Sequence, residues 1–124
     1  MKILLVDDSK TMRNIQKRTL AALPEAEFVE AGDGVEGLAA MNSSGPFQLV
    51  LVDWNMPNMD GITFVTKVRE TNKTTPMIMC TTEAEKTRVI DALKAGVNNY
   101  VVKPFTPEAL TEKVQQTLQK AKAA

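Results

Sequence analysis

The fold is decided by residues 49–61, which read Leu-Val-Leu-Val-Asp-Trp-Asn-Met-Pro-Asn-Met-Asp-Gly. The first four are apolar at consecutive rather than alternating positions. This pattern is typical of a strand that is covered on both faces, as in a parallel sheet with helices on each side. A carboxylate, Asp53, stands directly at the end of the predicted strand.

Working outward, short apolar runs of this kind alternate with longer amphipathic stretches along the whole chain. Strands are predicted at Lys2–Val6, Phe28–Ala31, Leu49–Val52, Met77–Cys80 and Asn99–Val102. Helices are predicted at Thr11–Ala22, Gly34–Asn42, Gly61–Thr71, Ala84–Ala95 and Pro107–Ala121. Strict alternation of strand and helix predicts a doubly wound α/β domain with a five-stranded parallel sheet, helices on both faces and right-handed crossovers.

Local signals at the ends of the predicted helices agree with this assignment. Thr106 before Pro107 is a good N-cap followed by proline at the first helical position. Asp33 with Glu36 resembles a capping box, and Gly96 is well placed to end the fourth helix.

Composition limits the chemistry that the chain can perform. The chain has 124 residues, fifteen basic and fifteen acidic, no histidine and one cysteine, Cys80. The absence of histidine excludes Ser-His-Asp and Cys-His catalysis, and the charge balance predicts no nucleic-acid partner. No stretch reaches membrane-spanning length, and a single cysteine suits a reducing cytoplasm. We expect one cytoplasmic domain over residues 1–124, without an output domain.

Three carboxylates are predicted to meet at one edge of the sheet. Asp7 and Asp8 follow the first strand and Asp53 follows the third. In a flavodoxin-like sheet of order 2-1-3-4-5 these strands are neighbours, and ligands bind beyond their carboxyl ends. Mutual repulsion of the carboxylates is relieved by a hard cation, and Mg²⁺ suits this ligand set. The alternative is that each aspartate is a cap or turn residue, with Asp8 capping the first helix.

Lys103 and Thr81 follow the fifth and fourth strands and are candidates for contacting a phosphoryl group at the same edge. The alternatives are a solvated lysine and a threonine that makes a local turn hydrogen bond. For Thr82 we prefer the turn interpretation. Tyr100 is equally well explained, from the residues alone, as a switch residue or as an ordinary half-buried aromatic.

Four segments in this order and spacing resemble the receiver domains of bacterial response regulators, in particular the CheY-like chemotaxis members. The matching segments are Val6-Asp7-Asp8-Ser9, Val52 to Gly61, Thr81, and Tyr100-Val101-Val102-Lys103-Pro104-Phe105. The resemblance covers essentially the whole chain. It implies a signalling switch that assists its own phosphorylation and dephosphorylation, and not an enzyme.

The resemblance also implies a role for each acidic residue. Asp53 is expected to accept a phosphoryl group from a histidine kinase. Asp8 and Asp53 are expected to bind Mg²⁺ directly, together with the backbone carbonyl of Asn55, while Asp7 acts through water.

Further expectations concern the switch. Thr81 and Lys103 are expected to contact phosphoryl oxygens, and Tyr100 to swing inward as Thr81 moves. Asn55 and Glu83 are expected to tune hydrolysis, and the peptide bond that follows Lys103 is expected to be cis.

The implied output is a changed surface over the fourth helix, fifth strand and fifth helix of a monomer. This surface is expected to bind a downstream protein such as a flagellar motor switch component, with a phosphatase as a further partner. Thr82, Cys80 and Glu85 depart from the chemotaxis pattern. A phosphorelay intermediate or a stand-alone receiver outside chemotaxis therefore stays open as an alternative.

Three alternative interpretations fit the same residues less well. A dehalogenase-type phosphatase requires a second aspartate at the position of Asn55. A flavodoxin requires a Ser/Thr/Gly-rich phosphate loop after the first strand, where this chain has Asp7-Asp8-Ser9-Lys10. An inert receiver-like scaffold is disfavoured by the complete acidic set.

Overall fold

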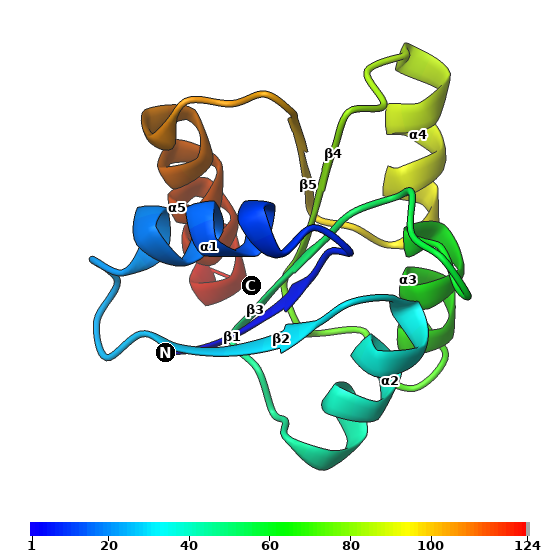
Figure 1. Ribbon diagram of the computed structural model, residues 1–124, viewed down its shortest axis with the longest axis horizontal. Coiled ribbons are helices and arrows are strands. Elements are labelled where there is room, and N and C mark those ends of the chain that lie inside the picture. Colours follow the sequence, from blue (N-terminus) through cyan, green and yellow to red (C-terminus); the bar gives the residue numbers. More distant parts are fainter. Residues whose placement is uncertain (124) are drawn as a thin grey trace.

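The computed structural model describes residues 1–123 as a five-stranded parallel sheet with five helices (Figure 1). The strand order is β2-β1-β3-β4-β5, so the predicted flavodoxin-like topology is confirmed. The strands are β1 Lys2–Val6, β2 Glu27–Ala31, β3 Leu49–Val52, β4 Met77–Thr81 and β5 Asn99–Val102. The helices are α1 Lys10–Leu20, α2 Gly34–Ser43, α3 Gly61–Arg69, α4 Lys86–Ala95 and α5 Pro107–Ala123. The expected domain limit at residue 124 lies outside the described residues.

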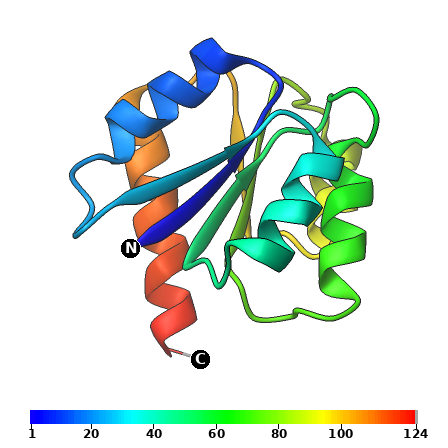
Figure 2. The ribbon, with the colours of Figure 1, turned by 60° about the horizontal axis from the view of Figure 1, so that its bottom comes forward.

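The sheet separates two helical layers, which Figure 2 shows from a second direction. Helices α1 and α5 cover one face, and α2, α3 and α4 cover the other. Neighbouring residues of a strand therefore enter different cores: Leu4 packs with the α2–α4 layer and Leu5 with the α1/α5 layer. Both are fully buried, which explains why the strands are apolar at every position.

The predicted bounds differ from the observed ones by at most two residues. Strand β4 extends to Thr81 and does not end at Cys80, and α4 begins at Lys86 and not at Ala84. The later start of α4 arises because Glu85 is extended, with φ −67° and ψ 141°, and its side chain caps nothing. Residues 82–85 thus form an irregular link between β4 and α4.

Most of the helix ends follow the predicted caps. The Asp33 carboxylate accepts from the Glu36 amide at 2.8 Å, and Gly96 ends α4 with φ 123°. The suggestion that Asp8 caps α1 was wrong, because the N-cap is Ser9. Asp8 is therefore free for another role. Among the described helices, none is both long and apolar enough to cross a membrane.

Candidate functional site

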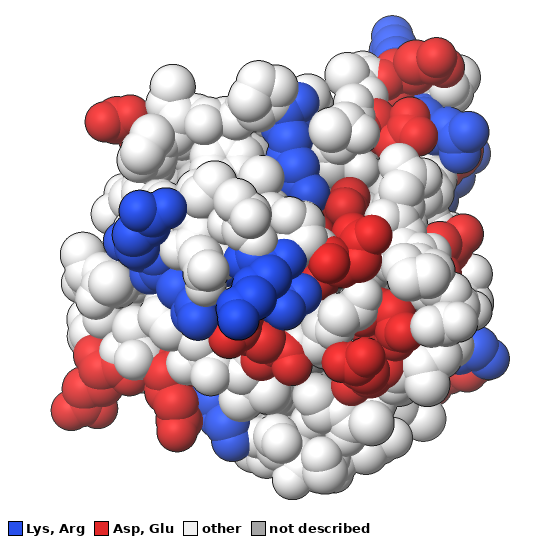
Figure 3. All heavy atoms as spheres, viewed as in Figure 1, with Lys and Arg blue, Asp and Glu red and all other residues white. Residues whose placement is uncertain are grey.

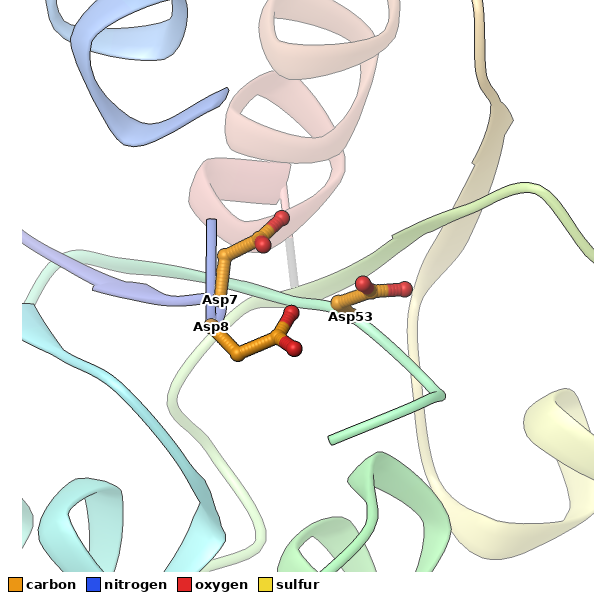
Figure 4. Close-up of side chains that lie close together, drawn as sticks. All are labelled: Asp7, Asp8 and Asp53. Carbon is orange, nitrogen blue, oxygen red and sulfur yellow. The ribbon is translucent and has the colours of Figure 1, made fainter. Parts of the chain in front are cut away.

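Asp7, Asp8 and Asp53 converge at the carboxyl edge of the sheet, as Figure 4 shows. One carboxylate oxygen of each lies within 4.8 Å of the others. Backbone hydrogen bonds set this arrangement: the Asp53 amide donates to the Val6 carbonyl at 2.9 Å, and the Asp7 amide donates to the Ala31 carbonyl at 3.0 Å. The predicted cluster therefore follows from strand pairing.

Lys103 joins this cluster from the end of β5. Its ammonium lies 2.7 Å from Asp7 Oδ2 and 3.2 Å from Asp53 Oδ2. The side chain is 10% exposed, and the Lys103 amide donates to the Thr81 carbonyl at 2.8 Å. The Lys103–Pro104 peptide bond is cis, as expected. The lysine is thus a buried partner of the carboxylates and not a solvated surface residue.

Burial and neighbouring charges have opposite effects on the pKa values of Asp7 and Lys103. Burial raises the pKa of Asp7, although the hydrogen bonds from Lys103 and the Ser9 amide act to lower it. Burial acts to lower the pKa of Lys103, but the hydrogen bond and charge of Asp7, with the charge of Asp53, raise it overall. The cluster thus holds three carboxylates and one ammonium, which pairs with two of them, and this imbalance favours a further cation.

The donor set fits a hard divalent ion. Carboxylate oxygens from three residues are available, and Asp8 is exposed, so the site opens to water. Mg²⁺ favours a few carboxylates together with water and phosphate oxygens. Figure 3 shows acidic side chains gathered near the carboxyl end of β1, with basic side chains beside them.

Two of the predicted residues lie together at the rim of the site. Asn55, from the β3–α3 loop, donates through Nδ2 to Glu83 Oε1 at 3.2 Å. Glu83 belongs to the β4–α4 link, so this bond joins two loops beside Asp53. Asn55 is exposed and Glu83 is half-buried, so this pair of polar side chains is open to water.

Thr81 and Tyr100 lie on the α2–α4 side of the sheet. Thr81 is fully buried, and its hydroxyl accepts a long, weak bond of 3.4 Å from the Glu83 amide. The Tyr100 ring is already inside, only 8% exposed, with its hydroxyl donating to the Glu83 carbonyl at 2.5 Å. Burial, followed by the charge of Glu83, raises the pKa of Tyr100 to about 12. The Tyr100 ring therefore already has, in this structure, the inward position that was expected after Thr81 moves.

Sequence reasoning missed three neighbours of the site. The Arg88 guanidinium stacks over the Trp54 ring, 5.0 Å from its centroid. Gly61 packs directly on the Asp53 carbonyl, and Gln16 is buried on α1. Only Gly61 had a signal in the sequence, as a glycine directly after the N-cap Asp60. The other two depend on how helices are rotated against the sheet.

Comparisons with known proteins agree with this geometry. The family model of the response regulator receiver domain matches residues 3–115. Chemotaxis protein CheY1 of Helicobacter pylori strain J99 is 51% identical over 120 residues, covering 95% of this chain and 97% of that protein. Chemotaxis protein CheY of Pseudomonas aeruginosa is 45% identical over 122 residues, covering 97% and 98%.

A solved structure extends the agreement to three dimensions. The CheY-like receiver domain protein of Methanospirillum hungatei superposes with a TM-score of 0.89 at 30% identity, over 98% of this chain and 96% of that one. The chain therefore belongs to the response regulator receiver domain family, whose members are phosphorylation-activated switches of two-component signalling.

Proposed function

We propose that Asp53 accepts the phosphoryl group in a Mg²⁺-dependent reaction with a phosphohistidine of a kinase partner. The observation that carries this proposal is a cluster of three carboxylates, two of which pair with one largely buried lysine. Asp53, at the end of the central strand β3, lies between the other charged groups of the site. Asp7 and Asp8 follow β1 on one side of it, and Lys103 follows β5 on the other.

The chain prepares Asp53 for attack in two ways. The Trp54 amide donates to Asp53 Oδ1 at 2.7 Å, which fixes the rotation of the carboxylate. Lys103 contacts Oδ2, and its ammonium provides a charge that a phosphoryl oxygen can share. A carboxylate oxygen forms the new bond to phosphorus while the bond from phosphorus to the donor nitrogen breaks. Asp8, Asp53 and the backbone carbonyl of Asn55 would hold Mg²⁺ directly, with Asp7 acting through water, and the bound ion would supply charge neutralisation and alignment.

Signal output is proposed to run through Thr81 and Tyr100. Phosphorylation adds strong acceptors beside the Thr81 hydroxyl, whose present bond to the Glu83 amide is weak. Drawing Thr81 toward the site alters the β4–α4 link, to which Tyr100 is hydrogen-bonded. Because Tyr100 is buried already, phosphorylation acts in this proposal by fixing the link that carries Glu83.

The proposed output surface is built from α4, β5 and α5. Three apolar side chains are exposed on α4 and β5: Ile90, Leu93 and Val102. Because α4 and β5 are in contact, exposed apolar residues on both favour a protein partner here. Ala84 and Glu85, just before α4, are also exposed, and Lys113 on α5 is half-buried.

We place the switch in chemotaxis, in the cytoplasm, with a flagellar motor component as the downstream target. The support is that relatives about half identical over nearly their whole length are named chemotaxis proteins. A receiver that relays phosphoryl groups outside chemotaxis is the alternative, since Glu85 and Thr82 alter the surface near α4.

The test of phosphorylation is incubation with Mg²⁺ and acetyl phosphate, followed by mass spectrometry of the intact chain. Wild type is expected to gain one phosphoryl group that is stable in acid and labile in base. Asp53→Asn is expected to gain none, while Asp91→Asn, which removes an exposed carboxylate on α4, labels normally. Undiminished labelling of Asp53→Asn refutes the assignment.

A further inference from the structure

Gln16 is a buried amide whose oxygen has no hydrogen-bond partner. The residue is 1% exposed in the middle of α1, and its Nε2 lies 3.7 Å from the sulfur of Cys80. Within residues 1–123, Gln16 Oε1 is the one buried side-chain nitrogen or oxygen that lacks a partner. An unpaired buried acceptor is destabilising, so its presence calls for an explanation.

The strand register places Gln16 next to the acidic cluster. Met79 pairs with Val52, so the next residue along each strand brings Cys80 level with Asp53. Cys80 belongs to the core under α1 and α5, and so does Leu51, two residues before Asp53. Because side chains alternate along a strand, Asp53 and Cys80 point to the same face. The Gln16 amide therefore lies beside the floor of the site, on the side that α1 covers.

Lys103 offers the donor that Gln16 Oε1 lacks. Its ammonium carries three protons, and two of them are directed to Asp7 and Asp53. In the described part of the chain the third proton has no acceptor. Lys103 follows Val101 by two residues, and Val101 packs with Cys80 in the same core. The unused donor and the unused acceptor thus face the same interior side of the sheet.

We propose that Gln16 is a positioning residue for Lys103: the ammonium donates its third hydrogen bond to one water molecule, and that water donates a hydrogen bond to Gln16 Oε1. This inference rests on the proposed function of Asp53 and deepens it. Held from three sides, the ammonium stays beside Asp53 Oδ2 and does not turn toward solvent. When Asp53 gains a phosphoryl group, the bonds to Asp7 and Asp53 rearrange while the link to Gln16 keeps the ammonium in place. Gln16 touches no reacting atom in this scheme and acts only through Lys103.

The experiment compares Gln16→Met with Leu20→Met. Methionine has a volume close to both side chains, and Leu20 lies one turn further from the site on the same buried face of α1. Phosphorylation rates are measured with acetyl phosphate at saturating Mg²⁺, together with Mg²⁺ affinity and urea stability. Gln16→Met is expected to slow phosphorylation about tenfold, the usual scale for groups that orient a site. Mg²⁺ affinity and folding are expected to stay close to wild type, and Leu20→Met to keep the wild-type rate.

Two readouts separate positioning from a merely structural role. In a Lys103→Ala background, adding Gln16→Met is expected to cause no further slowing. In the unphosphorylated chain, the ¹H–¹⁵N NMR signal of the Lys103 ammonium is expected to be observable in wild type and Leu20→Met, and lost or shifted in Gln16→Met. An unchanged Lys103 signal, or equal slowing with and without Lys103, overturns the proposal. If wild type takes no phosphoryl group, the function proposed for Asp53 fails, and the NMR comparison still decides the link to Gln16.

Discussion

Replacing Gly61 by alanine tests whether the start of α3 fixes the position of Asp53. A Cβ on Gly61 comes to 2.1 Å from the Asp53 carbonyl oxygen, 2.9 Å from its carbon and 3.0 Å from Trp54 Cα. All three are backbone atoms, so no side-chain rotation relieves the clash. The oxygen lies about 1.3 Å inside ordinary contact distance, which begins at 3.4 Å. The β3–α3 loop and α3 must therefore separate.

The separation also stretches the bond from the Gly61 amide to the Trp54 carbonyl, now 2.8 Å. Overpacking costs about 1–3 kcal/mol and a lost hydrogen bond about 1 kcal/mol. We therefore expect Gly61→Ala to lower the free energy of unfolding by about 3 kcal/mol. Phosphorylation is expected to slow as well, because the backbone of Asp53 is displaced.

The assay is urea unfolding followed by the fluorescence of Trp54, with free energies from linear extrapolation. Gly32→Ala is the matched control: the three atoms nearest to a Cβ there belong to the Glu36 carboxyl group, at 3.5 Å or more. The control is expected to change stability by no more than about 0.5 kcal/mol. A loss below about 1 kcal/mol for Gly61→Ala, or equal losses for both variants, refutes the reasoning.

Three further predictions concern the site and the core. Asp8→Ala is expected to weaken Mg²⁺ binding about tenfold or more because it removes a direct ligand. The affinity is measured by Trp54 fluorescence, and a variant that binds Mg²⁺ like wild type would show that Asp8 is not a ligand. Asn55→Lys is expected to change the rate of phosphate release severalfold, since it breaks the bond to Glu83 at the rim; an unchanged rate in a phosphate-release assay excludes this role. Burial raises the pKa of the Cys80 thiol to about 12, so at pH 8 the native chain is expected to react with thiol reagents only after urea is added. Rapid labelling of the native chain would contradict that burial.

The sequence was sufficient for the sheet and for the groups at its carboxyl edge. A short run of consecutive apolar residues, such as Leu49 to Val52, indicates a strand that is buried on both faces. Because this strand pairs with β1, the residues that follow the two strands, Asp53 and Asp7, lie close together. The start of α4 was missed because Ala84 is a good helix former, whereas no residue near Glu85 supplies a side-chain cap. Residue preferences alone do not mark where such a helix begins.

Contacts between the helices and the sheet could not be predicted from the sequence for a different reason. The stacking of Arg88 on Trp54 and the contact of Gln16 with Cys80 depend on the rotation and height of α4 and α1 over the strands. A polar residue within an amphipathic helix is usually read as solvent-facing. The inward position of Tyr100 likewise depends on the conformation of residues 82–85.

The ion pair between Lys103 and Asp7 joins residues 96 positions apart in the chain. A ribosome adds residues one after another, so Asp7, Asp8 and Asp53 are all made long before their lysine. The last strand has to be synthesised and docked beside β4 before the ammonium reaches the acidic cluster. In the proposed scheme, a nascent chain that ends before β5 therefore has every carboxylate of the site and yet lacks its cationic partner. In this scheme, the nascent chain becomes able to accept a phosphoryl group only after β5 and Lys103 have been made and docked.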